Sequence, residues 1–442
     1  MATPVEDLII VSVDDHVVEP PNMFDGRLLQ KYQDAAPRVV DTGDGRFIWA
    51  FEGFASRSLT TVATAGRPIE EREIEPTSYA DVRPGTYDVH ERVKDMSVNG
   101  ILGSMNFPSF PRFCGQMFAD VAAKDADLAL AVVEAYNNWH IEGWCGEYPD
   151  RFIPCAIVPL WDPQLMAAEV QRVADLGCHA VTFAANPYKL GLPSLHSDHW
   201  DPFWAACDEL DTIVCTHLGT GMDDIVTAPD APHLARINVL GTFLLWTASD
   251  LVWSQVFRKF ERLKVALSEG GIGWVPYFLE SAEFVYDHHV SWVPESKFYD
   301  RRPTEIFKEH IVTCFIEDAV GLEGIHHMNP DMVMLEVDYP HPDSNWPLSP
   351  EHAWKDLQQL PNEDLWDKIT HANAMRVFRF DPFTIRPRER CTVGALRAEV
   401  AGHDIDWIPG RALHWENKTQ GESAAAFKRE GAAAVDGGGA TP

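Results

Sequence analysis

Short apolar runs alternate along this chain with longer stretches of helical periodicity, and this alternation constrains the fold more than any other feature. The runs are rich in Val, Ile and Phe, as expected for strands buried on both faces of a parallel sheet. Between them, apolar residues recur at the spacing of amphipathic helices. The eight runs are LIIVSV, GILGSMNF, RFIPCAIVPL, CHAVTFAA, TIVCTHL, LKVALSE, IVTCFIE and DMVMLEVD.

Eight strand–helix units predict an α/β fold, specifically a (β/α)8 TIM-like barrel that carries insertions. A doubly wound open sheet is the competing fold, but no glycine-rich phosphate loop follows the first strand, and this disfavours it. The longest interruption, about residues 20–99, separates the first two strands. It contains DTGDGRFIWAFEGFASRS, which is typical of a β-hairpin around Gly43–Gly45. We expect this insertion to cap the barrel mouth.

The end of the chain loses the strand–helix rhythm after about Phe383. We therefore assign residues 1–383 to one barrel domain and residues 384–442 to an irregular C-terminal extension. The last stretch, ESAAAFKREGAAAVDGGGATP, is low in complexity, which is typical of a mobile tail.

The charge balance excludes two classes of partner. The chain has 67 acidic against 36 basic residues, a formal net charge of −31. Such a surface repels phosphate backbones and anionic lipids, so we expect neither nucleic-acid nor membrane binding. The N-terminus MATPVEDLII has no signal-peptide pattern, and the eight cysteines include no CxxC pair. These features predict a cytoplasmic protein with buried free thiols. The charge says little about the substrate, which we expect to be a small molecule.

Acidic and histidine residues stand at the carboxyl ends of four predicted strands, where a (β/α)8 barrel collects its chemistry. The first strand ends in Asp14-x-His16, and alternation along a strand points both side chains to the same side. The fifth ends in His217, the sixth in Glu269 and the eighth in Asp338. Two imidazoles and three carboxylates would then face one mouth.

Each of these residues has a simpler interpretation when taken alone. A histidine at a strand end is more often a hydrogen-bonded structural residue than a ligand, an aspartate before a turn is often a cap, and Glu269 could pair with an arginine. Their joint occurrence is harder to explain in this way. Charges packed together are costly without a cation to neutralise them, so the pattern predicts a metal site.

This arrangement resembles the amidohydrolase superfamily, in particular its amidohydrolase-related (family 2) branch. That branch includes aminocarboxymuconate-semialdehyde decarboxylase and the resorcylate decarboxylases. The similarity runs from about Ile9 to Phe380 and includes DYPHPDSNWP and NAMRVFRF. Matched residue by residue, the resemblance implies a divalent metal (Zn, Mn or Fe) bound by the following residues: Asp14, His16, His217 and Asp338.

Two departures from the family pattern bear on the chemistry. Asp14 replaces the first histidine of the commoner HxH element, and Glu269 stands where the decarboxylases usually have a catalytic histidine. Glu269 could be a metal ligand, a general base or the partner of a substrate amine. On the helix after the sixth strand, His288 or His289 could supply a ligand to a second metal ion, or both could be partly exposed helix residues.

Three functions remain open at this point. The first is a metal-dependent hydrolase or decarboxylase in which Asp338 is the general base and Glu269 assists. The second is a dinuclear non-haem iron oxygenase, since the 2-aminoisobutyrate hydroxylase subunits resemble this chain in their DxH start. The third is a metal-binding subunit of a complex. We expect His341 and Trp274 at the substrate side of the mouth, although a structural hydrogen bond and packing are the simpler roles. Family precedent implies a homodimer or a hetero-oligomer with a related chain.

Overall fold

Among the described residues, eight parallel strands form the centre of the molecule, and neighbouring strands follow one another in the order of the chain. The computed structural model describes residues 5–405, apart from 57, 73–74, 223–227 and 361. The strands pair in two sheets, in the orders β1-β5-β6 and β11-β10-β9-β8-β7. Their bounds are β1 Val11–Val17, β5 Gly103–Pro108, β6 Phe152–Ile153, β7 Ala180–Phe183, β8 Ile213–His217, β9 Val265–Ser268, β10 Ile311–Phe315 and β11 Val333–Leu335.

Backbone contacts link the two sheets at both of their edges. A parallel bridge between Ala156 and Val181 connects the segment after β6 to β7. At the other edge, the N–H of Asp338 donates to the carbonyl of Asp14 at 2.8 Å, and the N–H of His16 donates to the carbonyl of Tyr339 at 2.7 Å. The sheets thereby meet in a ring, and the predicted α/β fold with parallel strands is confirmed.

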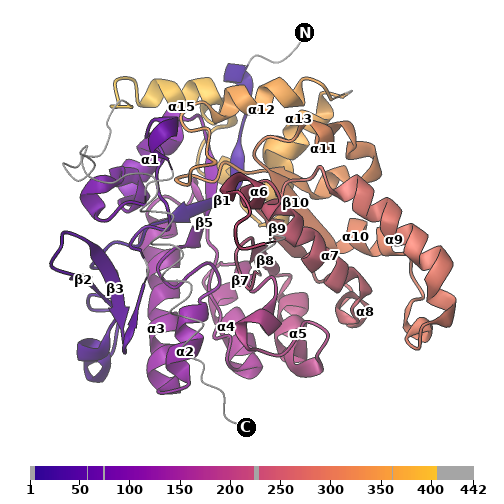
Figure 1. The fold of residues 1–442 in the computed structure, drawn as a ribbon. Helices are drawn as coiled ribbons and strands as arrows, with labels where there is room; N and C mark the ends of the chain where they lie inside the picture. The colour runs from indigo at the N-terminus through magenta and orange to yellow at the C-terminus, as the bar shows by residue number, and fades with distance from the viewer. Residues whose placement is uncertain (1–4, 57, 73–74, 223–227, 361, 406–442) are drawn as a thin grey trace.

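Helices surround the strands and cover their outer face (Figure 1). Local sequence signals fix where they begin: Asp162 caps α4 through the N–H groups of Gln164 and Leu165, and Pro163 occupies the first turn. The bounds are α1 Val89–Val98, α2 Gln116–Ala122, α3 Ala126–Asn138, α4 Pro163–Asp175, α5 Asp201–Leu210, α6 His233–Ile237, α7 Phe243–Trp253, α8 Val256–Lys259, α9 Val275–His289, α10 Pro303–His310, α11 Ala319–Glu323, α12 Ser349–Leu357, α13 Asp364–Asp367, α14 Asn373–Val377 and α15 Val393–Glu399.

Two large apolar clusters make up most of the described core, beside a small third cluster of Val18, Ala63 and Val82. The smaller of the two large clusters is built from alternate strand residues, such as Val11 and Val13 on β1 or Ile213 and Cys215 on β8. The larger one lies mainly between the strands and the helices and includes residues such as Phe183. This separation follows from the two-residue side-chain period of a strand, which sends alternate side chains to opposite faces. All eight cysteines are buried free thiols, as predicted.

The segment between β1 and β5 contains a three-stranded antiparallel sheet, β2 Arg38–Asp41, β3 Phe47–Phe51 and β4 Phe54–Ala55. The hairpin turns through Gly43 and Gly45, both of which have positive φ, so the predicted hairpin is confirmed. Further along, the N–H groups of Thr64 and Ala65 donate to the carbonyl of Pro340, in the loop after β11. Capping of the barrel mouth by this segment stays a prediction.

The C-terminal extension differs from the irregular tail predicted from residue 384. Residues Val393–Glu399 form α15, which packs against α1 and buries Val393 and Leu396. Arg397 anchors it through an ion pair with Glu351 at 2.7 Å. The low-complexity stretch lies outside the described residues. None of the described helices has the length and apolar character that crossing a membrane requires.

Candidate metal centre

A bulge in β1 sets the direction of the first two site residues. The pairing of β1 with β5 shifts register between Ser12 and Asp15, so the regular alternation of Val11 and Val13 is broken before the strand ends. Bulges re-aim side chains in this way and recur beside active sites. Asp14 lies within the bulge and His16 just beyond it; both are fully buried, with His16 Nε2 3.5 Å from Asp14 Oδ1.

The strand β8 delivers the second histidine by simple alternation, because Ile213, Cys215 and His217 stand two residues apart. The Nδ1 atom of His217 lies 2.6 Å from the carbonyl oxygen of Leu218. A carbonyl can only accept, so Nδ1 carries the proton and Nε2 keeps its lone pair, the usual state of a metal-binding imidazole. That Nε2 lies 3.1 Å from Nε2 of His16.

Asp338 completes the cluster from the segment after β11. Its backbone has a φ of +55°, an uncommon conformation for a residue other than glycine. Its Oδ1 lies 3.4 Å from His16 Nε2 and 2.8 Å from Nδ1 of His341. The ring of His341 in turn lies 3.8 Å from that of His16. The structure therefore brings Asp14, His16, His217, Asp338 and His341 together.

The two aspartates have the environment of metal ligands. By hydrogen-bond geometry, the carboxylates of Asp14 and Asp338 have no donor among the described residues, although Oδ1 of Asp338 lies 2.8 Å from Nδ1 of His341. A buried carboxylate without a partner is strongly unfavourable, so these two carboxylates require a cation or protons. Ligand atoms of Asp14, His16 and His217 lie within 4.8 Å of one another, and so do those of His16, Asp338 and His341. This mixture of imidazole and carboxylate donors suits Zn, Mn or Fe.

Glu269 approaches the same cluster from the end of β9. Its Oε2 lies 3.6 Å from Nε2 of His217, and its side chain is 19% exposed, whereas those of His217 and Asp338 are fully buried. A group of ligand atoms from Glu269, Asp338 and the exposed Asp343 also lies within 4.8 Å. Of the carboxylates Asp14, Asp338 and Glu269, Glu269 is therefore the one most open to a substrate.

The pKa values of the site residues differ from the ordinary values of their side chains. Burial raises the pKa of Asp14, and the charge of Asp15 raises it further. Burial also raises the pKa of Asp338, with Asp14 as the next cause, and that of Glu269, with Asp338 as the next cause. Burial lowers the pKa of His16 well below its usual range, so this imidazole is neutral and ready to bind a metal.

These shifts predict how the stability of the metal-free protein depends on pH. Carboxyl groups with a raised pKa in the folded state bind protons more tightly than in the unfolded state, so folding loses their contribution as pH rises. The melting temperature of the metal-free chain should therefore fall as the pH rises above the ordinary carboxyl pKa of about 4, while the lowered pKa of His16 acts in the opposite direction. Added Mn²⁺ should remove most of this fall, since the ion replaces the protons. Thermal melts at a series of pH values, with and without Mn²⁺, measure both effects. An equal loss of stability in both series would contradict this assignment.

Three predicted site residues belong to none of the ligand clusters found among the described residues. His288 and His289 are exposed at the end of α9, where their rings contact Phe284 and Trp292, and neither belongs to a ligand cluster among the described residues. Helical direction explains this, because α9 carries its last turn away from the strand ends. Trp274 donates its indole N–H to the carbonyl of Gly270 at 3.0 Å and packs on aromatic rings, as the simpler interpretation predicted.

Two residues near the centre were not predicted from the sequence. Phe113, in the loop after β5, places its ring 4.2 Å from that of His217 and 4.8 Å from that of His16. Glu336 is buried two residues before Asp338, and its ligand atoms cluster with those of Asp14 and Cys314. The two-residue spacing of Glu336 and Asp338 could have indicated that Glu336 lies near the site. Nothing in the sequence indicates that Phe113 lies beside the two histidines.

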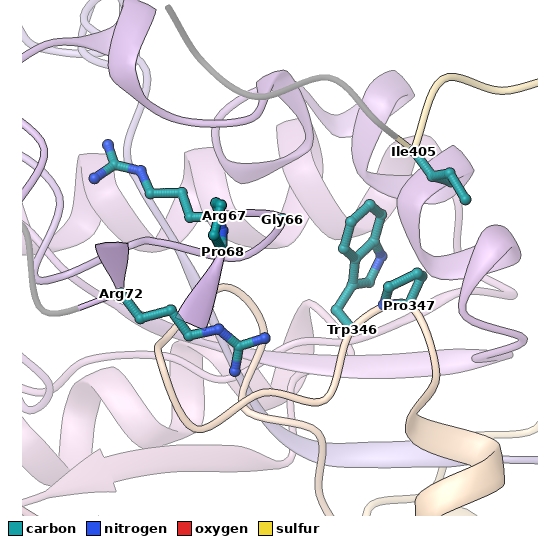
Figure 2. Close-up of a pocket in the computed structure, with 7 residues that line it drawn as sticks. All are labelled: Gly66, Arg67, Pro68, Arg72, Trp346, Pro347 and Ile405. Atoms are coloured by element: carbon teal, nitrogen blue, oxygen red, sulfur yellow. The ribbon is translucent and has the colours of Figure 1, made fainter. Parts of the chain in front are cut away.

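A hollow of about 310 Å³ lies outside the metal centre (Figure 2). Figure 2 shows Trp346 and Pro347 on one side of it and Arg67 and Pro68 on the other. Arg72, which also lines it, donates to the carbonyl oxygens of Pro342 at 2.9 Å and Ser344 at 3.2 Å. Arg72 thereby ties the segment after β1 to the loop that carries His341.

Comparisons with known proteins find similar sequences and similar folds. The chain is 27% identical over 307 residues to a gamma-resorcylate decarboxylase of Rhizobium sp. (strain MTP-10005), covering 66% of this chain and 86% of that protein. An amidohydrolase structure from Mycobacterium avium subsp. paratuberculosis matches with a TM-score of 0.66 and 20% identity, over 84% of this chain and 99% of that one. A 5-carboxyvanillate decarboxylase from Novosphingobium aromaticivorans, complexed with manganese and 4-hydroxy-3-methoxy-5-nitrobenzoic acid, matches with a TM-score of 0.56 and 19% identity, over 85% and 98%.

The family itself is shown by a sequence model rather than by any one relative. That model, described as Amidohydrolase, matches residues 90–380, about two-thirds of the chain. The match includes β5 to β11 and therefore three of the strands that supply the centre, while β1 with Asp14 and His16 precedes it. The chain belongs to the amidohydrolase family.

Proposed function

We propose that this chain is a metal-dependent enzyme that decarboxylates a small aromatic acid. The observation that carries the proposal is the cluster of Asp14, His16, His217 and Asp338, with its two fully buried carboxylates. The named activity of the gamma-resorcylate and 5-carboxyvanillate decarboxylases supports the substrate class. The four residues would hold one divalent ion, Mn, Zn or Fe. Such an ion orients a carboxylate group and stabilises negative charge.

The residues around the cluster supply the remaining functions. Asp338 can deliver a proton to the ring carbon that bears the carboxylate; the bond from that carbon to the carboxylate then breaks, its electron pair returns to the ring, and CO2 leaves. His341, 2.8 Å from Asp338 Oδ1, can share and return that proton. The ring of Phe113 lies beside both histidines and offers a surface on which an aromatic substrate can stack.

Hydrolysis is a second candidate because of one residue, Glu269. A carboxylate close to His217 and partly open to solvent can take a proton from an attacking water molecule. The oxygenase hypothesis is weaker, since neither His288 nor His289 reaches the cluster to bind a second ion. Non-catalytic support of a related chain is the third hypothesis.

One experiment separates these functions. The chain is loaded with Mn²⁺ and incubated without oxygen with a panel of hydroxybenzoates carrying ¹³C in the carboxyl group, and with matching esters and amides. We expect release of ¹³CO2 together with the phenol that remains when the carboxyl group has left the ring. Release of alcohol or amine without labelled CO2 would establish hydrolysis instead. Turnover only with iron and oxygen would establish oxygenation, and turnover only with a co-purified related chain would indicate a supporting subunit.

Assembly with a second copy or a related chain is part of the same proposal. Exposed aromatic residues on α7 and α9, namely Trp246 and Tyr277, support an interface there, because large exposed apolar side chains often mark contact surfaces. Light scattering of the purified chain would measure its mass, and a monomer without a partner would exclude the homodimer.

A further inference from the structure

Glu269 holds an uncommon backbone conformation at the end of β9. Its φ is +64°, in the left-handed region that side chains with a Cβ rarely adopt. It comes directly after Ser268, the last residue of the strand, and before Gly270 and Gly271. Such a conformation persists only when surrounding contacts hold it, and it recurs at functional sites. The direction of the Glu269 carboxylate therefore depends on whatever fixes its backbone.

Glu336 makes the contact that fixes it. Its Oε2 accepts a hydrogen bond from the backbone N–H of Glu269 at 3.1 Å and another from the thiol of Cys314 at 2.6 Å. Glu336 is 2% exposed and stands two residues before Asp338, so its side chain is directed to the same side as that ligand. Glu336 is thus a buried acid that contacts the backbone of Glu269, at the end of β9.

A second carboxylate holds the far end of the same loop. Asp318 accepts hydrogen bonds from the backbone N–H groups of Ile272 at 2.7 Å and Gly273 at 2.6 Å. The loop that follows β9 is therefore fixed at both ends by side chains from other parts of the chain. Of the two, only Glu336 contacts the residue that faces the metal cluster.

We propose that Glu336 is a positioning residue, whose hydrogen bond to the Glu269 backbone keeps the Glu269 carboxylate directed at His217. Without this acceptor, the N–H of Glu269 loses its partner and the backbone can relax to negative φ. The carboxylate, now 3.6 Å from His217 Nε2, would then turn away from the cluster. The inference rests on the proposed function to the extent that Glu269 faces the substrate.

The test compares Glu336→Met, which removes the acceptor at similar size, with Glu336→Gln, which keeps a carbonyl oxygen. Misplacing a group at the reacting centre costs about 100-fold in rate, so we expect kcat to fall about 10- to 100-fold in Glu336→Met. KM and the bound metal should stay unchanged, and Glu336→Gln should recover most of the rate. Cys314→Ala, which removes the other donor to Glu336, is the matched control and should keep wild-type kcat.

Combining each change with Glu269→Ala shows whether Glu336 acts through Glu269. We expect Glu336→Met to cause no further loss in the Glu269→Ala background. An equal loss in both backgrounds, or no loss in either, would overturn the inference. Should Glu336→Met fail to fold, Glu336→Asp, whose shorter side chain withdraws the oxygen from the Glu269 N–H, takes its place with the same outcomes.

A readout independent of turnover separates this inference from the proposed function. In a crystal structure of Glu336→Met, the φ of Glu269 should be negative and its carboxylate should have left His217. A retained φ near +64° would overturn the positioning role whatever reaction the enzyme catalyses. If instead the wild-type chain releases no CO2 but Glu269 moves as expected, the proposed function fails and the positioning role stands.

Discussion

Replacing His217 with alanine should abolish retention of the metal ion, and all metal-dependent turnover with it. The Nε2 of His217 lies 3.1 Å from that of His16 and 3.5 Å from Oδ1 of Asp14, so its removal opens one side of the ligand set. Loss of a residue that merely supports a ligand weakens metal binding about 10- to 100-fold, and loss of a ligand should cost more. Elemental analysis after gel filtration measures the metal content per chain.

A matched control uses the histidines that the structure places away from the cluster. The double variant His288→Ala/His289→Ala should keep the wild-type metal content, because both residues are exposed on α9. Asp14→Ala should behave like His217→Ala. Metal retained by His217→Ala or Asp14→Ala, or lost from the α9 double variant, would show that the ligand assignment is wrong.

Replacing Asp338 with asparagine should lower kcat by about 10²- to 10⁴-fold, the range that a general acid or base supplies. Asparagine has nearly the same shape but cannot exchange a proton, and its amide cannot match the charge of the carboxylate that contacts His16 and His341. Steady-state kinetics with the Mn²⁺-loaded variant measure the effect, after correction for bound metal. Asp343→Asn, a nearby exposed carboxylate, is the control and should lose far less. An Asp338→Asn enzyme with wild-type kcat would exclude Asp338 from proton transfer.

The structure brings together the candidate ligands that the sequence named, but their surroundings could not be predicted from the sequence. Asp14, His16, His217 and Asp338 end strands, and the carboxyl ends of parallel strands meet at one face, so counting strands was enough to bring them together. His341 followed from its place three residues after Asp338. Each of these predictions depended on the local sequence at the end of a strand and on the rule that the carboxyl ends of parallel strands meet at one face.

What the sequence could not supply depended on contacts between distant segments. The bulge in β1 is defined by its register with β5, and the role of Glu336 depends on a backbone N–H 67 residues away. The sequence left open whether the histidines of α9 reach the site, because tertiary packing sets the direction of a helix relative to the strand ends. The helix α15, Val393–Glu399, is too short to show a clear helical period in the sequence, and it is stabilised by its fit against α1.

Diffraction data collected at the manganese absorption edge, from crystals of the Mn²⁺-loaded chain, would test the metal centre most directly. The account predicts one strong anomalous peak per chain, within bonding distance of Asp14, His16, His217 and Asp338. A cluster without a peak, or a peak held by other residues, would contradict it.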